Sequence, residues 1–157
     1  MIREFILGSL GAFFGALGFS VLVNAPRRTI LPISLTALAG YLAYLLLYRL
    51  GERGVLASYF LSTVVISLFC ELEARVMRMP TTVFLLCALV PLVPGYSFYS
   101  AMLALVENDG MHAASAMMQA MQIVAAIAVG AAASSSCVRM LMGIKKRGKP
   151  IDFPRRI

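Results

Sequence analysis

Long apolar runs are the feature that most constrains how this chain can fold. Of its 157 residues, 61% are hydrophobic and only 13% are charged, and the charged residues cluster between the runs. A bilayer core of about 30 Å requires about 20 apolar helical residues per crossing, and several runs reach that length. The sequence therefore predicts an all-α integral membrane protein with one membrane domain.

We expect five transmembrane helices within a membrane domain of residues 1–143, followed by a basic cytoplasmic tail at 144–157. The expected spans cover about residues 5–23, 30–50, 55–74, 81–106 and 115–142. The first run is long for a signal peptide, and proline follows directly after its cleavage-like "VNA". An uncleaved span is therefore the expected reading of this run.

The distribution of basic residues predicts the orientation of these spans. With the N-terminus outside and the C-terminus in the cytoplasm, 11 of the 14 basic residues lie inside. The three left outside are Arg3, Arg49 and Arg53. Cytoplasmic loops carry the excess of Lys and Arg, so this topology is favoured over its inverse.

The fourth run contains the sequence VPLVPGYSFYS, which interrupts its own helix. Pro91 and Pro94 have no N–H to donate to the carbonyls of Cys87 and Val90, and Gly95 adds conformational freedom. Free backbone groups at membrane depth are tolerated only where protein or water satisfies them. We therefore expect the fourth helix to be broken at Pro91–Gly95, near the bilayer midplane.

A broken helix at this depth is typical of solute sites in secondary transporters. The half-helix after the break presents free N–H groups and a positive dipole end, which suit a carboxylate. Hydroxyl side chains follow at once, at Tyr96, Ser97, Tyr99 and Ser100. We expect Pro91, Pro94, Gly95, Tyr96, Ser97, Tyr99 and Asn24 to line or gate a path for a small anionic or zwitterionic metabolite. The alternative is a proline kink that only shapes the helix.

Charged residues at the end of the third run form a second candidate. Glu71 and Arg75 have i,i+4 spacing in the favourable order, whereas Glu73 points to another side of the helix. Ionisable groups at membrane depth are functional candidates, here for proton coupling through Glu71, Glu73 and Arg75. The alternative is an interfacial ion-pair cluster that ends the span.

The segment between the first two spans holds Asn24, Arg27 and Arg28. Asn24 is placed to cap or bend the chain before Pro26. The two arginines either attract anions to the inner mouth or only mark topology. His112 is expected to be a solvated residue of an external loop.

Small residues recur along the first span, at Gly8, Gly11, Gly15 and Gly18. Glycines on one face allow two membrane helices to approach closely. We expect this face to pack against another helix, within this chain or in a partner.

Several classes of function lack their motifs. Cys70, Cys87 and Cys137 are far apart, which favours neither a metal site nor a disulfide framework. No phosphate-binding loop, catalytic triad or paired-carboxylate arrangement occurs in the sequence, so we expect no cofactor and no enzymatic activity. Half of the basic residues follow the last apolar run, which favours a topology signal over nucleic-acid binding.

Two segments resemble the threonine/serine exporter family, specifically its short small-subunit form, which corresponds to the carboxy-terminal half of full-length exporters. The first is a G-F-x-x-x-x-N-x-P segment and the second a P-x-x-P-G segment. The matching residues are Gly18, Phe19, Asn24 and Pro26, then Pro91, Pro94 and Gly95.

This resemblance implies export of small amino acids, threonine or serine, or of dicarboxylates such as succinate, across the bacterial inner membrane. It also implies a larger five-span partner subunit that carries the other half of the exporter. A homo-oligomer in the lipid bilayer is the alternative assembly. A subunit that only scaffolds a partner, without transporting, is the alternative function.

Overall fold

The computed structural model describes residues 2–50 and 54–146. Within these ranges the chain forms six α-helices and one short 3-10 helix, with no strand. The elements are α1 (Ile2–Leu22), α2 (Arg27–Leu50), α3 (Val55–Met77), α4 (Thr81–Ala88), η1 (Val90–Leu92), α5 (Gly95–Val106) and α6 (Gly110–Lys146). Arg53 and residues 147–157 of the predicted tail lie outside the described residues.

The helices confirm the predicted all-α membrane fold. Helices α1, α2, α3 and α6 are each long and apolar enough to cross a bilayer. The segments Thr81–Leu92 and Gly95–Val106 pass the same test together and meet at an angle of 55°. They are either one broken span, the fourth along the chain, or a re-entrant loop. The break falls at the predicted prolines.

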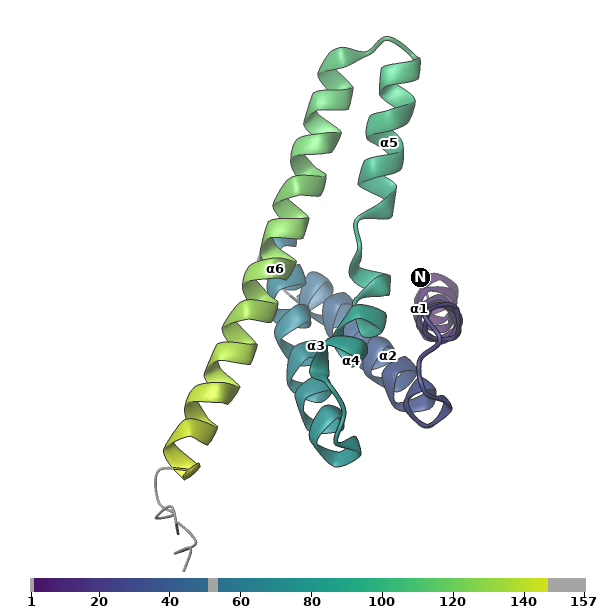
Figure 1. Ribbon diagram of the computed structural model, residues 1–157. Helices are drawn as coiled ribbons and strands as arrows, with labels where there is room; N and C mark the ends of the chain where they lie inside the picture. Colours follow the sequence, from purple (N-terminus) through teal and green to yellow (C-terminus); the bar gives the residue numbers. More distant parts are fainter. Residues whose placement is uncertain (1, 51–53, 147–157) are drawn as a thin grey trace, which may run out of the picture.

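The core lies where α4 and η1 meet the first three helices (Figure 1). It joins one side chain or more from each element: Ala16 of α1, Ile33 of α2, Ile66 of α3, Phe84 of α4 and Leu92 of η1. Each of these five is at most 2% exposed. The half of the fourth span that precedes the break is therefore held firmly by its neighbours.

Two glycines allow α3 to approach its neighbours closely. A side chain at Gly40 of α2 would clash with Ile66, and the Ser62 hydroxyl donates to the Gly40 carbonyl at 2.5 Å. A Cβ at Gly130 of α6 would lie 2.9 Å from the Phe60 carbonyl oxygen. Small residues that permit backbone contact are the usual means of packing helices in a membrane.

Helices α1, α3 and α5 end in the same way. Asn24, Arg78 and Asn108 adopt left-handed conformations, with φ of 57°, 54° and 59°. After each, the next N–H donates to a carbonyl five residues back, as from Ala25 to Ser20 at 2.9 Å. This is the Schellman motif, which satisfies the last carbonyls of a helix. Asn24 therefore has a structural role as the residue that ends α1.

Helix α5 and the first half of α6 form an antiparallel hairpin that extends away from the other helices (Figure 1). Helix α6 begins at Gly110, five residues before the predicted span, because Asp109 caps it. The Asp109 carboxylate accepts the backbone N–H of His112 at 3.0 Å. His112 consequently lies in the first turn of α6, which corrects its expected place in a loop.

Candidate functional site

The chain turns sharply between η1 and α5. Pro94 has φ −76° and ψ 56°, and the Gly95 N–H donates to the Val93 carbonyl at 2.8 Å. These values define an inverse γ-turn centred on Pro94. Before it, the Val93 N–H donates to the Val90 carbonyl at 3.3 Å in a 3-10 turn.

These two hydrogen bonds correct the sequence prediction for the break. The Val90 carbonyl was expected to be free, and so were the N–H groups at the start of the second half-helix, but the Val90 carbonyl and the Gly95 N–H both have backbone partners. The turn thus satisfies much of its own backbone, which lowers the cost of placing it in a membrane. The next N–H groups, of Tyr96 and Ser97, belong to the first turn of α5, where a helix has no internal acceptor for them.

A cavity of about 260 Å³ adjoins the break, and its walls are apolar. Leu86, Leu89, Val93, Pro94, Val124 and Ile127 line it. Pro94 is buried and Val93 is 57% exposed beside it. The space directly at the prolines therefore does not offer polar contacts to a solute, and the polar region begins at the next residues along α5.

That polar region is a groove of about 350 Å³ between α5 and α6. Tyr96 and Ser100 line it from α5, at i and i+4 spacing, which places them on one face. His112, Ser115 and Gln119 line it from α6, at i, i+3 and i+7, together with Ala116. The groove, which we call the hairpin groove, is built from residues that the sequence does not place together.

Hydrogen bonds within the hairpin groove determine what it can offer to a solute. The Ser100 hydroxyl donates to the Ser97 carbonyl at 3.0 Å, and the Ser115 hydroxyl donates to the His112 carbonyl at 2.9 Å. Because each hydroxyl already donates its proton to a backbone carbonyl, each presents only acceptor lone pairs to the groove. The phenol of Tyr96 and the carboxamide of Gln119 can each donate and accept. Neutral groups of both kinds are thus available side by side.

The structure separates the four predicted hydroxyl residues of α5. Tyr96 is 83% exposed and shares the groove with Ser100, whereas Ser97 is buried. Tyr99 is 65% exposed and is not among the residues that line the groove. A helix turns 100° per residue, so neighbouring hydroxyls cannot all face one space.

The two glutamates of α3 have different surroundings. The Glu71 carboxylate pairs with the Arg75 guanidinium at 3.1 Å. One Glu73 oxygen, Oε1, accepts the Thr36 hydroxyl of α2 at 2.5 Å, while the other, Oε2, is buried without a partner. A cavity of about 310 Å³ adjoins Glu73, lined also by Leu35, Thr36, Ala39 and Phe69. Sequence reasoning missed Thr36, because a threonine in an apolar span has many roles.

The remaining predicted residues lie apart from the groove. Arg27 and Arg28 are exposed in the first turn of α2. Of the four glycines on α1, Gly8 meets the Tyr41 side chain. Among the described residues, none lies within 4 Å of a Cβ added at Gly11, Gly15 or Gly18, so they leave that part of the face open.

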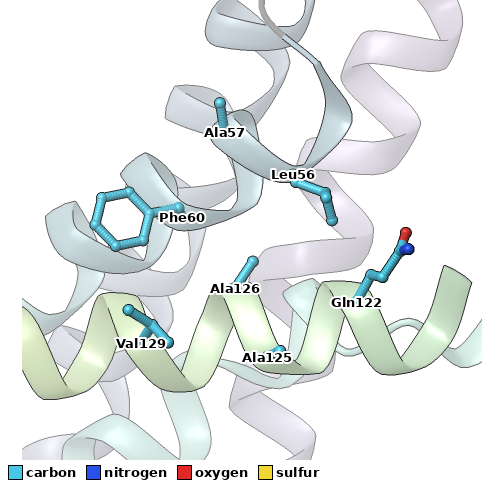
Figure 2. Close-up of a pocket in the computed structure, with 7 residues that line it drawn as sticks. All are labelled: Leu56, Ala57, Phe60, Gln122, Ala125, Ala126 and Val129. Atoms are coloured by element: carbon cyan, nitrogen blue, oxygen red, sulfur yellow. The ribbon is translucent and has the colours of Figure 1, made fainter. Parts of the chain in front are cut away.

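A hollow of about 510 Å³ lies between α3 and α6, and its lining comes from Leu56, Ala57 and Phe60 of α3 and from Ala125, Ala126 and Val129 of α6 (Figure 2). Gln122 is its one polar lining residue. A wall of this kind suits a lipid tail or an apolar side chain better than a polar solute. Among the described residues no group of His, Cys, Asp and Glu could hold a metal ion.

Together, the four long apolar helices and the bent α4–α5 segment define a multi-pass helical membrane protein with a polar groove beyond the break. Residues 8–137 match the family described as Threonine/Serine exporter, ThrE. The chain belongs to this family of membrane transporters, as its two sequence segments predicted.

One relative is an uncharacterized protein of Haemophilus influenzae, 29% identical over 98 residues. The aligned part is 62% of this chain and 33% of that protein, so the chain spans about a third of the length of the relative. No solved structure matches the chain.

Proposed function

We propose that the chain is a subunit of an exporter for small amino acids, such as threonine and serine, and that the hairpin groove is part of the solute path. The observation that carries this proposal is the polar groove that begins immediately after the helix break. Discontinuous helices with polar groups at the break are a recurrent design of transporter sites. Pro91, Pro94 and Gly95 would then form the hinge between the two half-helices.

The chemistry of the groove favours an amino acid over a dicarboxylate such as succinate. The described residues that line it include no lysine or arginine, so a dianion would lack a permanent counter-charge for each of its two carboxylates. A zwitterion can give its ammonium group to the Ser100 and Ser115 acceptors and its carboxylate to the neutral donors. The residues at the hairpin tip, Glu107 and Asp109, are acidic and would repel a dianion.

We further propose that the exporter lies in the bacterial inner membrane with its N-terminus outside and its C-terminus in the cytoplasm. The excess of basic residues in the segments that would then be cytoplasmic supports this orientation. The hairpin groove then occupies the outer half of the membrane. Arg27 and Arg28 lie at the inner surface, where they would attract anionic groups.

The assembly is proposed to include a second polypeptide, either a larger five-span subunit or another copy of this chain. The open face at Gly11, Gly15 and Gly18 supports this proposal, because small-residue faces pack helices in membranes. The projecting hairpin supports it as well, since α5 packs chiefly on α6 (Figure 1). The alternative is a subunit that scaffolds a transporting partner without forming the path.

A matched pair of tyrosines on α5 tests the path. Tyr96→Phe removes a hydroxyl from the groove, and Tyr99→Phe removes the same group from a residue outside it. Loss of one hydrogen bond to a solute costs about 0.5–1.5 kcal/mol, so we expect Tyr96→Phe to lower export about two- to tenfold. Tyr99→Phe should export like the unmodified protein.

The measurement is efflux of labelled threonine, serine and succinate from cells that lack the gene and carry each variant. Membrane abundance of every variant is measured in parallel. Equal export by both variants, with the protein present, would favour the scaffold alternative. Efflux of succinate but not of the amino acids would contradict the assignment of solute class.

A further inference from the structure

The two glutamates of α3 are two residues apart, yet among the described residues only Glu71 has a cationic partner. We propose that Glu73 is the residue at which the exporter binds and releases a proton during transport, and that Thr36 positions its carboxyl group. This inference rests on the proposed transport function. The sequence leaves both Glu71 and Glu73 as candidates for proton coupling, and this inference assigns that role to Glu73 alone.

The surroundings of Glu73 are built for a group that changes its charge. Oε1 is held by the Thr36 hydroxyl, and Oε2 is inaccessible to solvent and has no hydrogen-bond donor. Burying a charged carboxylate with one of its two oxygens unpaired costs free energy, and burying the neutral acid costs much less. The adjoining cavity of about 310 Å³ gives water and protons a place to approach the carboxyl group.

Glu71 lacks these properties. Its carboxylate lies 3.1 Å from the Arg75 guanidinium, in an i,i+4 pair on the side of α3. The arginine is a permanent cation, so this contact is a charge-assisted hydrogen bond. Glu71 and Arg75 therefore act as a fixed pair near the end of the span, and Glu73 is left as the group free to take up a proton.

Few titratable groups surround Glu73. On α3 they are Cys70 and the Glu71–Arg75 pair, with exposed Arg78 after the helix end. The α2 residues that line the cavity, Leu35, Thr36 and Ala39, carry no charge. Helix α4, which packs on α2 and α3, contributes the buried thiol of Cys87 to the same core as Cys70. The described residues place no cation in contact with the Glu73 carboxylate.

A proton fits this site better than a metal cation. Hard cations take about six oxygen ligands, often from several carboxylates and carbonyls. The residues that line the Glu73 cavity supply one carboxyl group and one hydroxyl. In each cycle the carboxylate would gain one proton that comes from the outer side, become neutral, and lose that proton on the cytoplasmic side, while one solute molecule moves outward.

Protonation has a route to the helix break. The Thr36–Glu73 hydrogen bond ties α2 to α3, and a charged acceptor makes such a bond stronger than a neutral one. Helix α4 packs on both helices and leads directly through η1 into the break. A weaker Thr36–Glu73 hydrogen bond would therefore change the packing of α4, the helix that leads into the hinge.

The test uses the full chain, with any subunit that co-purifies, reconstituted into liposomes. Two readouts are compared: accumulation of labelled threonine driven by a pH gradient, and exchange of labelled for unlabelled threonine without a gradient. Glu73→Gln should reduce gradient-driven accumulation at least about tenfold while exchange stays within about twofold, because only net transport needs the proton. Glu71→Gln, the matched control two residues away, should retain both activities.

Thr36 is tested as a positioning residue. Thr36→Val should lower gradient-driven accumulation relative to exchange, and Thr36→Ser, which restores the hydroxyl, should recover it. A purely structural role for Thr36 would lower both activities together, and that result would overturn its assignment.

A spectroscopic readout separates the proton site from the transport function. Infrared difference spectra recorded across pH should show a carboxyl band that is absent in Glu73→Gln and present in Glu71→Gln. If this holds while the unmodified protein moves no threonine, the transport proposal fails and the proton site stands. The inference would be overturned if the carboxyl band persisted in Glu73→Gln or if this variant kept gradient-driven accumulation. Accumulation driven by sodium in place of protons would overturn it as well.

Discussion

Single residues at helix ends set where each span stops. Asn24, Arg78 and Asn108 all occupy the left-handed position of a Schellman motif, which glycine fills most easily. Asparagine tolerates this conformation because its short side chain bonds locally, whereas arginine does not. Arg78 is therefore the most strained of the three, and it lies directly after the Glu71–Arg75 pair and Glu73.

Replacement of Arg78 by glycine should stabilise the protein. Relief of the left-handed backbone is worth roughly 1 kcal/mol or more, and loss of a cation at the helix end removes a few tenths, so we expect a net gain of about 0.5–1 kcal/mol. Asn24→Gly is the control and should gain less. Thermal unfolding in detergent measures both, and an Arg78→Gly protein that melts earlier than the unmodified chain would contradict this account of the helix end.

At the scale of elements, glycines decide how closely the helices pack. Gly130 brings α6 onto the backbone of α3, next to the apolar hollow of Figure 2. Gly15 of α1 faces open space within the chain. Glycine thus allows close packing within the chain on α6, whereas on α1 it leaves a surface open to another helix.

Gly130→Ala should destabilise the chain, because its new Cβ would lie 2.9 Å from the Phe60 carbonyl oxygen. Forcing a methyl group into a packed contact costs roughly 1–3 kcal/mol. Gly15→Leu should leave the unfolding of the chain nearly unchanged but weaken its association with a partner. Thermal melts and cross-linking in membranes separate the two effects. A strong loss of stability in Gly15→Leu would show that its face is already packed within the chain.

The elements themselves were largely predictable. Apolar runs about 20 residues long have no other stable fold in a bilayer, and Pro91 and Pro94 could not stay within a regular helix. The closure of the break by the Val93 and Gly95 N–H groups was not predictable, because it depends on turn geometry. Nor was the groove predictable, since His112 and Gln119 share it with Tyr96 only once α6 folds back along α5.

The pairing of Thr36 with Glu73 shows the same limit. Sequence spacing identifies partners within one helix, as it did for Glu71 and Arg75. A contact between α2 and α3 depends on their rotation and register, which Gly40 and Ile66 set by close packing. Long-range pairs of this kind leave no periodic signal in the sequence.

At the scale of the whole molecule, the two polar regions lie at opposite ends of the fold. The Thr36–Glu73 contact is in the last turns of α3, beside the inner segments of the proposed topology. The hairpin groove lies beyond the break, toward the tip of the α5–α6 hairpin, which is the outer end in the proposed topology. Helix α4 and η1 connect the two, and their core residues Phe84 and Leu92 are fully or almost fully buried. This arrangement suits a transporter in which solute and proton use separate sites.

The most direct test of the account is whether solute reaches the hairpin groove from water. Cys137 is the one exposed cysteine among the described residues and is first replaced by serine, while Cys70 and Cys87 are buried. Ser115→Cys then places a thiol in the groove, and Tyr99→Cys places one outside it. The rate of labelling by a membrane-impermeant thiol reagent is measured in intact cells, with and without saturating threonine. We expect Ser115→Cys to be labelled and threonine to slow this labelling, with no such protection at Tyr99→Cys. A Ser115→Cys thiol that stays unlabelled, or that threonine does not protect, would contradict a solute path through this groove.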